Sequence, residues 1–145
     1  MIQISKKSLK KGMKDNIERK QPSINDVVFY DGLPLFSFIE LNINEICNRA
    51  CVFCPRVDPS VYPNQNIHMD IEVAENIAAQ LEKLNFTGIV NISGTGEPLL
   101  TKHITDIVAA FGKREIHVEI VTNGDVLTRR KGPELIKNLY ASGLK

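Results

Sequence analysis

The three cysteines of this chain lie within a single stretch of eight residues, as Cys47, Cys51 and Cys54. Thiolates suit iron–sulfur clusters, and a cubane cluster is normally closed by four of them. Because the sequence holds no fourth cysteine, a cluster bound at this CxxxCxxC spacing would keep one iron free for an outside ligand. The spacing therefore predicts a metal centre with an open coordination position, where chemistry would take place.

A structural zinc site is the alternative for the same cysteines, with His68 as the fourth ligand. Structural zinc is closed by four nitrogen or sulfur ligands, and its motifs usually pair two ligand couplets. No second couplet occurs in the sequence, so the pattern favours iron–sulfur over zinc. Outside this alternative, His68, His103 and His117 are predicted to be surface residues or to have ordinary partners. Arg49 and Arg56 flank the cysteines and could steer an anionic substrate, but the prediction favours solvated side chains.

The chain has the size and composition of one soluble domain. It contains 145 residues, of which 43% are hydrophobic and 24% charged, near the averages for globular proteins. No apolar run approaches the roughly 20 residues that cross a bilayer, so no membrane partner is expected. No secretory signal is visible either, so we expect a reducing, cytoplasmic location.

Positive charge is concentrated at the start of the chain. Residues 1–21 hold seven lysines or arginines against two acids, although the formal net charge of the chain is +1. We predict a basic N-terminal extension over residues 1–22, followed by one domain over residues 23–145. Because no aromatic residues interleave with the lysines for base stacking, the extension is not expected to bind nucleic acid.

The rest of the sequence alternates between strand and helix patterns. Residues 27–34 are typical of a short hairpin with a turn at Asp31-Gly32, and residues 36–43 of a strand buried on both faces. Further strands are predicted over residues 89–92 and 116–121. Such alternation predicts an α/β fold of parallel βα units, with helices covering a parallel sheet.

Three helices are predicted between and after these strands from their apolar stripes and end signals. The stripes are Val73, Ala74, Ile77, Ala78, Leu81 and Leu84 after a cap at Asp70; Ile104, Ile107, Val108 and Phe111 before Gly112; and Leu135, Ile136, Leu139 and Tyr140 between Pro133 and Gly143.

Three polar segments each follow a predicted strand: the cysteine loop, Gly94–Glu97 and Thr122–Gly124. Ligands of parallel sheets bind at the carboxyl ends of the strands, so we expect the three segments to converge on one rim. Taken alone, the second segment is better explained as a strand-to-helix turn with an acid near a helix N-terminus. The third, with its Asn-Gly pair, is equally an ordinary turn. Position rather than composition makes them candidate site residues.

In this order, the motifs resemble those of the radical S-adenosylmethionine (SAM) enzymes. The resemblance covers residues 36–144. It depends on CxxxCxxC after the first strand, an aromatic residue before the last cysteine, Gly-Glu-Pro after the second strand and Thr-Asn-Gly after the third. It implies a [4Fe-4S] cluster held by Cys47, Cys51 and Cys54. The fourth iron of that cluster would be chelated by the amino and carboxylate groups of SAM.

The resemblance also implies which other residues bind the cofactor. The implied positions are Phe53 near the adenine, Gly96 and Glu97 at the methionine ammonium, and Thr122 and Asn123 beside SAM. Thr95 stands where the family has the first glycine of a Gly-Gly-Glu segment, a departure that concerns the conformation of this loop.

The fold implied by the resemblance is the first half of a partial (β/α)6 TIM-like barrel. The implied reaction is reductive cleavage of SAM to methionine and a 5′-deoxyadenosyl radical, which abstracts hydrogen from a substrate. An external one-electron reductant of the flavodoxin or ferredoxin type is implied as a partner. Since the chain reaches Lys145 after three strand–helix units, we expect a fragment of a longer protein or a chain that needs a partner.

Within the family, Cys-Val-Phe-Cys-Pro and Gly-Glu-Pro-Leu-Leu look most like the branch that modifies peptides or small metabolites. An RNA-modifying member is the runner-up, to which only the basic extension points. The rival class is a non-catalytic metal-binding or interaction module. Such a module would hold zinc, or a cluster that does not respond to SAM.

Overall fold

The computed structural model describes residues 28–145, which divide after Ser37 into two units. The described part of the first unit is a hairpin, and the second unit is an α/β domain. The basic extension predicted over residues 1–22 lies outside the described residues.

The hairpin consists of β1 (Phe29–Tyr30) and β2 (Leu33–Pro34), which pair in antiparallel orientation. Between them, Asp31 has φ 50° and Gly32 has φ 77°. Two consecutive left-handed residues are the conformation that two-residue hairpin turns favour. The hairpin predicted from the Asp-Gly pair is therefore confirmed.

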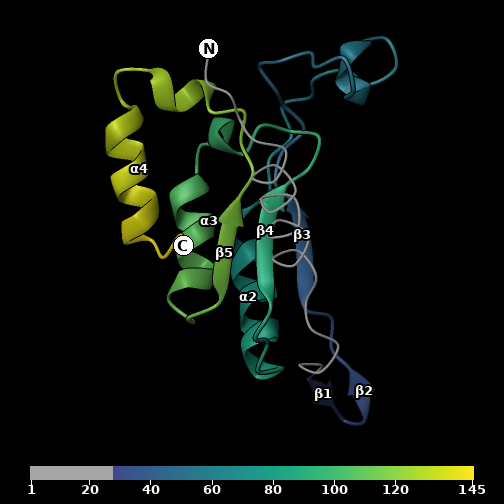
Figure 1. The fold of residues 1–145 in the computed structure, drawn as a ribbon, viewed down its shortest axis with the longest axis vertical. Coiled ribbons are helices and arrows are strands. Elements are labelled where there is room, and N and C mark those ends of the chain that lie inside the picture. Colours follow the sequence, from purple (N-terminus) through teal and green to yellow (C-terminus); the bar gives the residue numbers. More distant parts are fainter. Residues whose placement is uncertain (1–27) are drawn as a thin grey trace, which may run out of the picture. The chain divides into compact units, whose positions relative to one another are not determined.

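The α/β unit is built on three parallel strands in the order β3-β4-β5, which lie side by side in Figure 1. Their bounds are Phe38–Asn42 for β3, Ile89–Ser93 for β4 and His117–Ile120 for β5. In the register of the sheet, Leu41 pairs with Ile92. The predicted arrangement of parallel βα units is confirmed.

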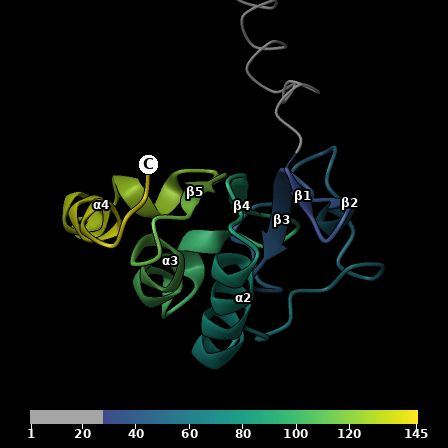
Figure 2. The ribbon, with the colours of Figure 1, turned by 90° about the horizontal axis from the view of Figure 1, so that it is seen from below.

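The helices that connect the strands are α2 (Ile71–Lys83) and α3 (Ile104–Gly112), and α4 (Gly132–Ala141) follows β5. Figure 2 shows α2 and α3 on the same face of the sheet. Within residues 28–145, no helix is both long enough and apolar enough for a membrane crossing. Short 3-10 helices begin directly after each of the three candidate segments: η2 (Pro55–Val57), η3 (Pro98–Leu100) and η4 (Asp125–Thr128).

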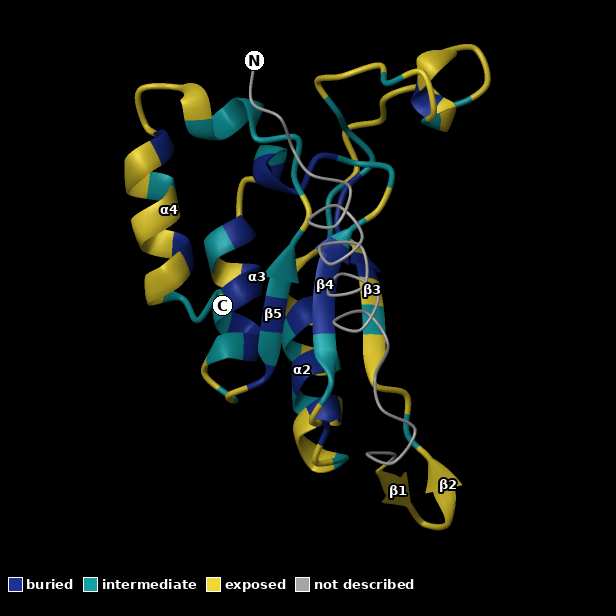
Figure 3. Cartoon of the chain, viewed as in Figure 1, coloured by how far each residue is buried: buried dark blue, intermediate teal, exposed yellow. Residues whose placement is uncertain are grey.

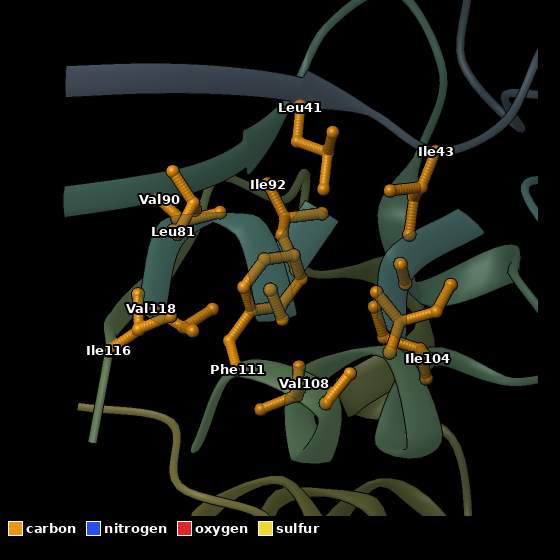
Figure 4. Close-up of a cluster of buried hydrophobic side chains, with 14 of the residues drawn as sticks. Leu41, Ile43, Leu81, Val90, Ile92, Ile104, Val108, Phe111, Ile116 and Val118 are labelled. Atoms are coloured by element: carbon orange, nitrogen blue, oxygen red, sulfur yellow. The ribbon is translucent and has the colours of Figure 1, made fainter. Parts of the chain in front are cut away.

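The hydrophobic core lies mainly between the sheet and helices α2 and α3 (Figure 4). Val90 and Ile92 of β4, Val118 of β5 and Phe111 of α3 have no exposed surface. Full burial of side chains of this size stabilises the fold by about 1.5–3 kcal/mol each. The central strand β4 is therefore the best buried of the three (Figure 3), and it carries the loop with the predicted Gly-Glu segment.

The first strand differs from the prediction of a strand buried on both faces. Leu41 is buried, but Phe38, Glu40 and Asn42 are exposed, with Phe38 at 51%. Since β3 has one neighbouring strand among residues 28–145 and the helices cover one face of the sheet, its side chains alternate between core and surface. Apolar residues such as Phe38 predict a strand, but they do not predict which of its side chains are buried.

In two of the helices, the predicted apolar stripe is wider than the face that is buried. Val73 on α2 and Ile136 and Tyr140 on α4 are exposed, whereas the stripe of α3 is buried throughout. The third helix lies between α2 and α4, while each of those two has a described helical neighbour on one side only. A helix at the border of the layer buries a narrower stripe than a central one.

Gly112 is the last residue of α3, as predicted, but it lacks the left-handed conformation of a glycine that stops a helix. A Cβ at Gly112 would lie 2.1 Å from the carbonyl oxygen of Ser142, so this glycine permits close packing against the end of α4. Gly143, the predicted stop of α4, has φ 103°, which is a left-handed conformation that favours glycine.

Candidate functional site

The three candidate segments converge at the carboxyl end of the sheet, which is the upper end in Figure 1. The backbone N–H of Glu97 donates to the carbonyl of Ile46 at 2.8 Å, which joins the loop after β4 to the start of the cysteine loop. The loop after β5 contacts both of the others through Asn123. The convergence predicted from the strand order is therefore confirmed.

Glu97 is the central residue of this rim, and its side chain is buried, with 2% exposed. Oε1 accepts hydrogen bonds from the Leu99 N–H at 3.0 Å and the Thr122 hydroxyl at 2.6 Å. Oε2 accepts from the Asn123 N–H at 2.8 Å. A carboxylate offers about four acceptor positions, so one position on Oε2 stays open.

The charge of Glu97 is not balanced by a cation among residues 28–145, where its side-chain partners are the neutral donors just described. A buried carboxylate is stabilised by such donors, and a cationic ligand at the open position would add a stronger, charge-assisted bond. The capping interaction expected of an acid before a helix is also present, because Leu99 belongs to η3. The residue thus has a structural role, and one acceptor position of its carboxylate has no donor among the hydrogen bonds just described.

Gly96 is required by the approach of a neighbouring segment. A Cβ at this position would lie 1.8 Å from Oδ1 and 2.3 Å from the backbone oxygen of Asn44. Asn44 is itself buried and donates to the Glu97 carbonyl at 2.8 Å and to the Thr101 hydroxyl at 2.6 Å. Any side chain at Gly96 would therefore displace the network that holds the Glu97 backbone.

The three cysteines are free thiols of intermediate burial. The Cys54 N–H donates to the Cys51 carbonyl at 2.9 Å, so residues 51–54 form a tight turn that contains the last two cysteines. Nowhere in residues 28–145 are three or more histidines, cysteines or acids close enough together to hold a metal ion. The donor set nevertheless fits an iron–sulfur cluster in its chemistry, because three free thiols lie within eight residues on one irregular loop.

Phe53 belongs to this loop, and it is 89% exposed. Its predicted place near an adenine therefore stays a prediction. At the other end of the loop, Cys47 borders a pocket of about 290 Å³ that Arg56, Tyr62 and Asn64 also line. The pocket leaves room beside the first cysteine.

A polar network joins the cysteine loop to the loop after β5. Asn123 Nδ2 donates to Asn48 Oδ1 at 2.9 Å and lies 3.9 Å from the Cys47 sulfur. Asn48 Nδ2 in turn donates to Asp125 Oδ2 at 2.9 Å. The first cysteine and the predicted cofactor residue Asn123 are thus direct neighbours.

Arg49 is exposed as predicted, with 49% of its side chain accessible, but it is also paired. Its Nε donates to Asp125 Oδ2 at 2.9 Å, and its Nη2 pairs with the other oxygen of the same carboxylate. This two-pronged pair raises the pKa of Arg49 and lowers the pKa of Asp125, in both cases chiefly through the side-chain hydrogen bond. Arg49 therefore connects the cysteine loop to the loop after β5 by an ion pair.

The same prediction is wrong for Arg56, which is buried with 6% exposed. Its Nε donates to the Thr95 carbonyl at 2.6 Å, and its Nη2 pairs with Glu45 Oε2 at 2.7 Å. A buried guanidinium is stable where its donors are satisfied, and here carbonyl and carboxylate oxygens satisfy them. Thr95, at the position where the sequence departs from the family pattern, is thus held by its backbone.

The histidines are not gathered with the thiols. His68 Nε2 lies 3.0 Å from Asn66 Oδ1, and no set of metal ligands within residues 28–145 includes this histidine. His103 faces Asp106 at 3.5 Å, and His117 faces Glu119 at 3.4 Å, so both are partly exposed residues with ordinary partners.

Comparison with known proteins gives two kinds of match in sequence. The family model for the Radical SAM superfamily matches residues 41–145. An S-adenosyl-L-methionine-dependent 2-deoxy-scyllo-inosamine dehydrogenase of Niallia circulans is 36% identical over 101 residues, which are 67% of this chain and 39% of that enzyme. A GTP 3′,8-cyclase of Synechocystis sp. is 31% identical over 97 residues, which are 63% of this chain and 27% of the cyclase.

Solved structures give a matching result. A crystal structure of BtrN in complex with AdoMet and 2-DOIA has a TM-score of 0.66 at 31% identity, covering 76% of this chain and 43% of BtrN. BtrN in an open conformation has a TM-score of 0.62 and covers the same share of this chain. The chain therefore spans less than half the length of these relatives.

Proposed function

Since this chain belongs to the radical SAM superfamily, we propose that it is the cluster- and SAM-binding part of a radical SAM enzyme. When bound, the [4Fe-4S] cluster and SAM supply reductive cleavage of the sulfonium and a 5′-deoxyadenosyl radical that abstracts hydrogen from a substrate. The protein contributes binding, orientation and exclusion of water.

Three thiolates of the chain would hold the cluster, namely those of Cys47, Cys51 and Cys54. Their number leaves one iron without a protein ligand, as the chelation of SAM requires. Asn123, 3.9 Å from the Cys47 sulfur, is placed to donate a hydrogen bond to that thiolate. Hydrogen bonds to cluster sulfurs influence the reduction potential.

The buried carboxylate of Glu97 is the observation that carries the proposal. It is fixed between the ends of β4 and β5 by Thr122 and Asn123, and it keeps one acceptor position on Oε2. Such a preorganised negative charge suits the ammonium group of a methionine moiety. The absence of a side chain at Gly96 lets the Glu97 backbone approach Asn44 and keeps the carboxylate in place.

The substrate we propose is a small metabolite rather than a peptide. The two sequence relatives are named for reactions of small molecules, an aminocyclitol and a nucleotide. The chain spans 39% and 27% of those enzymes, so the rest of such a protein would supply most of the substrate contacts. An external one-electron donor of the flavodoxin or ferredoxin type would reduce the cluster.

Anaerobic reconstitution of the chain with iron and sulfide tests the proposal. We expect about four irons and four sulfides per chain, as one cubane cluster requires. Cys47→Ala, Cys51→Ala and Cys54→Ala should each lose the cluster. Stoichiometric zinc in place of iron, or variants that keep as much iron as the wild type, would contradict the proposed function in favour of a metal-binding module.

A further inference from the structure

The side-chain amide of Asn64 binds both backbone groups of Cys47. Its Oδ1 accepts a hydrogen bond from the Cys47 N–H at 2.8 Å, and its Nδ2 donates to the Cys47 carbonyl at 3.0 Å. One side chain thus pairs with the first cysteine as a residue of a neighbouring strand would. Because both backbone groups of Cys47 are held, the direction of its Cα–Cβ bond is held as well.

Arg56 determines which way this amide faces. Its Nη1 donates to Asn64 Oδ1 at 3.1 Å and to the carbonyl of Pro63, the preceding residue, at 3.1 Å. Oδ1 of Asn64 therefore receives two donors, from Arg56 and Cys47. A reversed amide would place its NH₂ group against both of these donors, so the hydrogen bonds fix a single orientation.

The same arginine reaches the loop that carries Glu97. Its Nε donates to the Thr95 carbonyl at 2.6 Å, while Nη2 pairs with Glu45. The ring of Tyr62 covers the guanidinium at 4.7 Å, and the Tyr62 hydroxyl donates to the same Glu45 oxygen at 3.0 Å. The side chain of Arg56 is 3% exposed, and its planar donors contact three separate segments at once.

We propose that Asn64 and Arg56 are positioning residues that hold Cys47 at a fixed place relative to the Gly94–Glu97 loop. Through them, the first cluster ligand is connected to the carboxylate that would bind the SAM ammonium. The proposal rests on the proposed function and extends it to two residues outside the predicted site. They act through Cys47 and Thr95, which they contact directly.

Amide hydrogen exchange in the metal-free chain tests the contact itself. Asn64→Ala should speed exchange of the Cys47 N–H by about tenfold, the effect of losing one ordinary hydrogen bond. The matched control is Asn138→Ala, at an exposed position of α4. This control should leave the Cys47 amide unchanged. Unchanged exchange in Asn64→Ala would overturn the proposal before any cofactor is added.

Cluster binding tests the positioning role. Residues that orient metal ligands typically change metal affinity by about 10- to 100-fold, so Asn64→Ala should lose iron to a chelator at correspondingly lower concentration. Its electron paramagnetic resonance (EPR) response to SAM should weaken as well, while Asn138→Ala behaves as wild type. Faster exchange with wild-type cluster retention and SAM response overturns the positioning role. A wild-type chain that takes up no cluster contradicts the proposed function, and the positioning role with it.

Two conservative variants keep the test independent of a general loss of folding. Asn64→Asp retains an acceptor for the Cys47 N–H and for Arg56 but cannot donate to the Cys47 carbonyl, so its exchange should lie between wild type and Asn64→Ala. Arg56→Lys keeps the charge but cannot reach all four acceptors. It should also speed Cys47 exchange, whereas the exposed control Arg130→Lys should not. Equal exchange in Asn64→Asp and Asn64→Ala would contradict the proposed pairing.

Discussion

Thr122 donates its side-chain hydroxyl to Glu97 Oε1 at 2.6 Å, which joins the end of β5 directly to the loop after β4. The following backbone amide, that of Asn123, donates to the other carboxylate oxygen at 2.8 Å. Two segments that each look like an ordinary turn thereby form one negatively charged site.

Removal of the Thr122 hydroxyl should weaken the junction. We expect Thr122→Val to lower the free energy of unfolding by about 1–3 kcal/mol. The hydroxyl that donates to Glu97 is lost, and with it the acceptor of the Gly124 N–H. Thr122→Ser keeps the hydroxyl and should lose at most about 1 kcal/mol, the value of one methyl group. Urea denaturation measures both, and equal losses would show that the hydroxyl is not responsible.

Replacement of Glu97 by glutamine should destabilise the site although the two side chains are nearly equal in size. In Glu97→Gln, an NH₂ group would face the Asn123 N–H, so two donors oppose each other at a cost of about 1–3 kcal/mol. Binding of SAM should fall as well, because the negative charge is gone. Glu40→Gln on the exposed side of β3 is the control and should change neither property. SAM binding is followed by equilibrium dialysis, and unimpaired binding by Glu97→Gln would exclude the assigned role.

Two glycines of the rim should respond differently to alanine. In Gly96→Ala the new Cβ overlaps Asn44, whose hydrogen bonds to Glu97 and Thr101 must break, so we expect a loss of about 3 kcal/mol or more. At Gly124, φ is 77°, but an added Cβ would have no neighbouring atom within 4 Å. Alanine there should cost only about 1–2 kcal/mol, from backbone strain. Thermal unfolding ranks the two variants, and the reverse order would refute the steric argument.

The pair of Arg49 and Asp125 should make stability depend on pH in the acid range. Arg49 lowers the pKa of Asp125 below its ordinary value of 3.8. Because the folded chain has the lower pKa, the pair stabilises the fold above pH 3.8, and this stabilisation is lost as the pH falls through the folded pKa. We expect the gap in unfolding free energy between wild type and Asp125→Asn to close on acidification. A gap that is independent of pH would argue against the ion pair, and added salt should narrow it at neutral pH.

The fold was predictable from the sequence wherever local pattern and tertiary environment agree. Strands such as Ile89–Ser93 are apolar runs between glycine-containing turns, and they are buried as the pattern indicates. The burial of Phe38 and Val73 was not predictable, because it depends on which faces of an element have neighbours, and neighbours are set by the order of the layers. Periodicity locates an element but does not report the position of that element in the sheet.

The site was predictable from the order of motifs along the strands, which placed Glu97 and Thr122 on one rim. The partners Asp125, Glu45 and Asn64 were missed. Asp125 directly follows the Thr-Asn-Gly segment, so its place after a strand was an available signal. Asn64 gave no such signal, because its contact with Cys47 joins residues 17 positions apart through an irregular loop. Contacts of this kind arise from the folded path of the loop and leave no periodic trace.

The most direct measurement of the central claim is the EPR spectrum of the anaerobically reconstituted, reduced chain, recorded with and without SAM. We predict a [4Fe-4S] signal that SAM shifts, since in the proposed function one iron has no protein ligand and Glu97 receives the ammonium group. A four-iron cluster whose spectrum is the same with and without SAM would contradict an open coordination position for this cofactor.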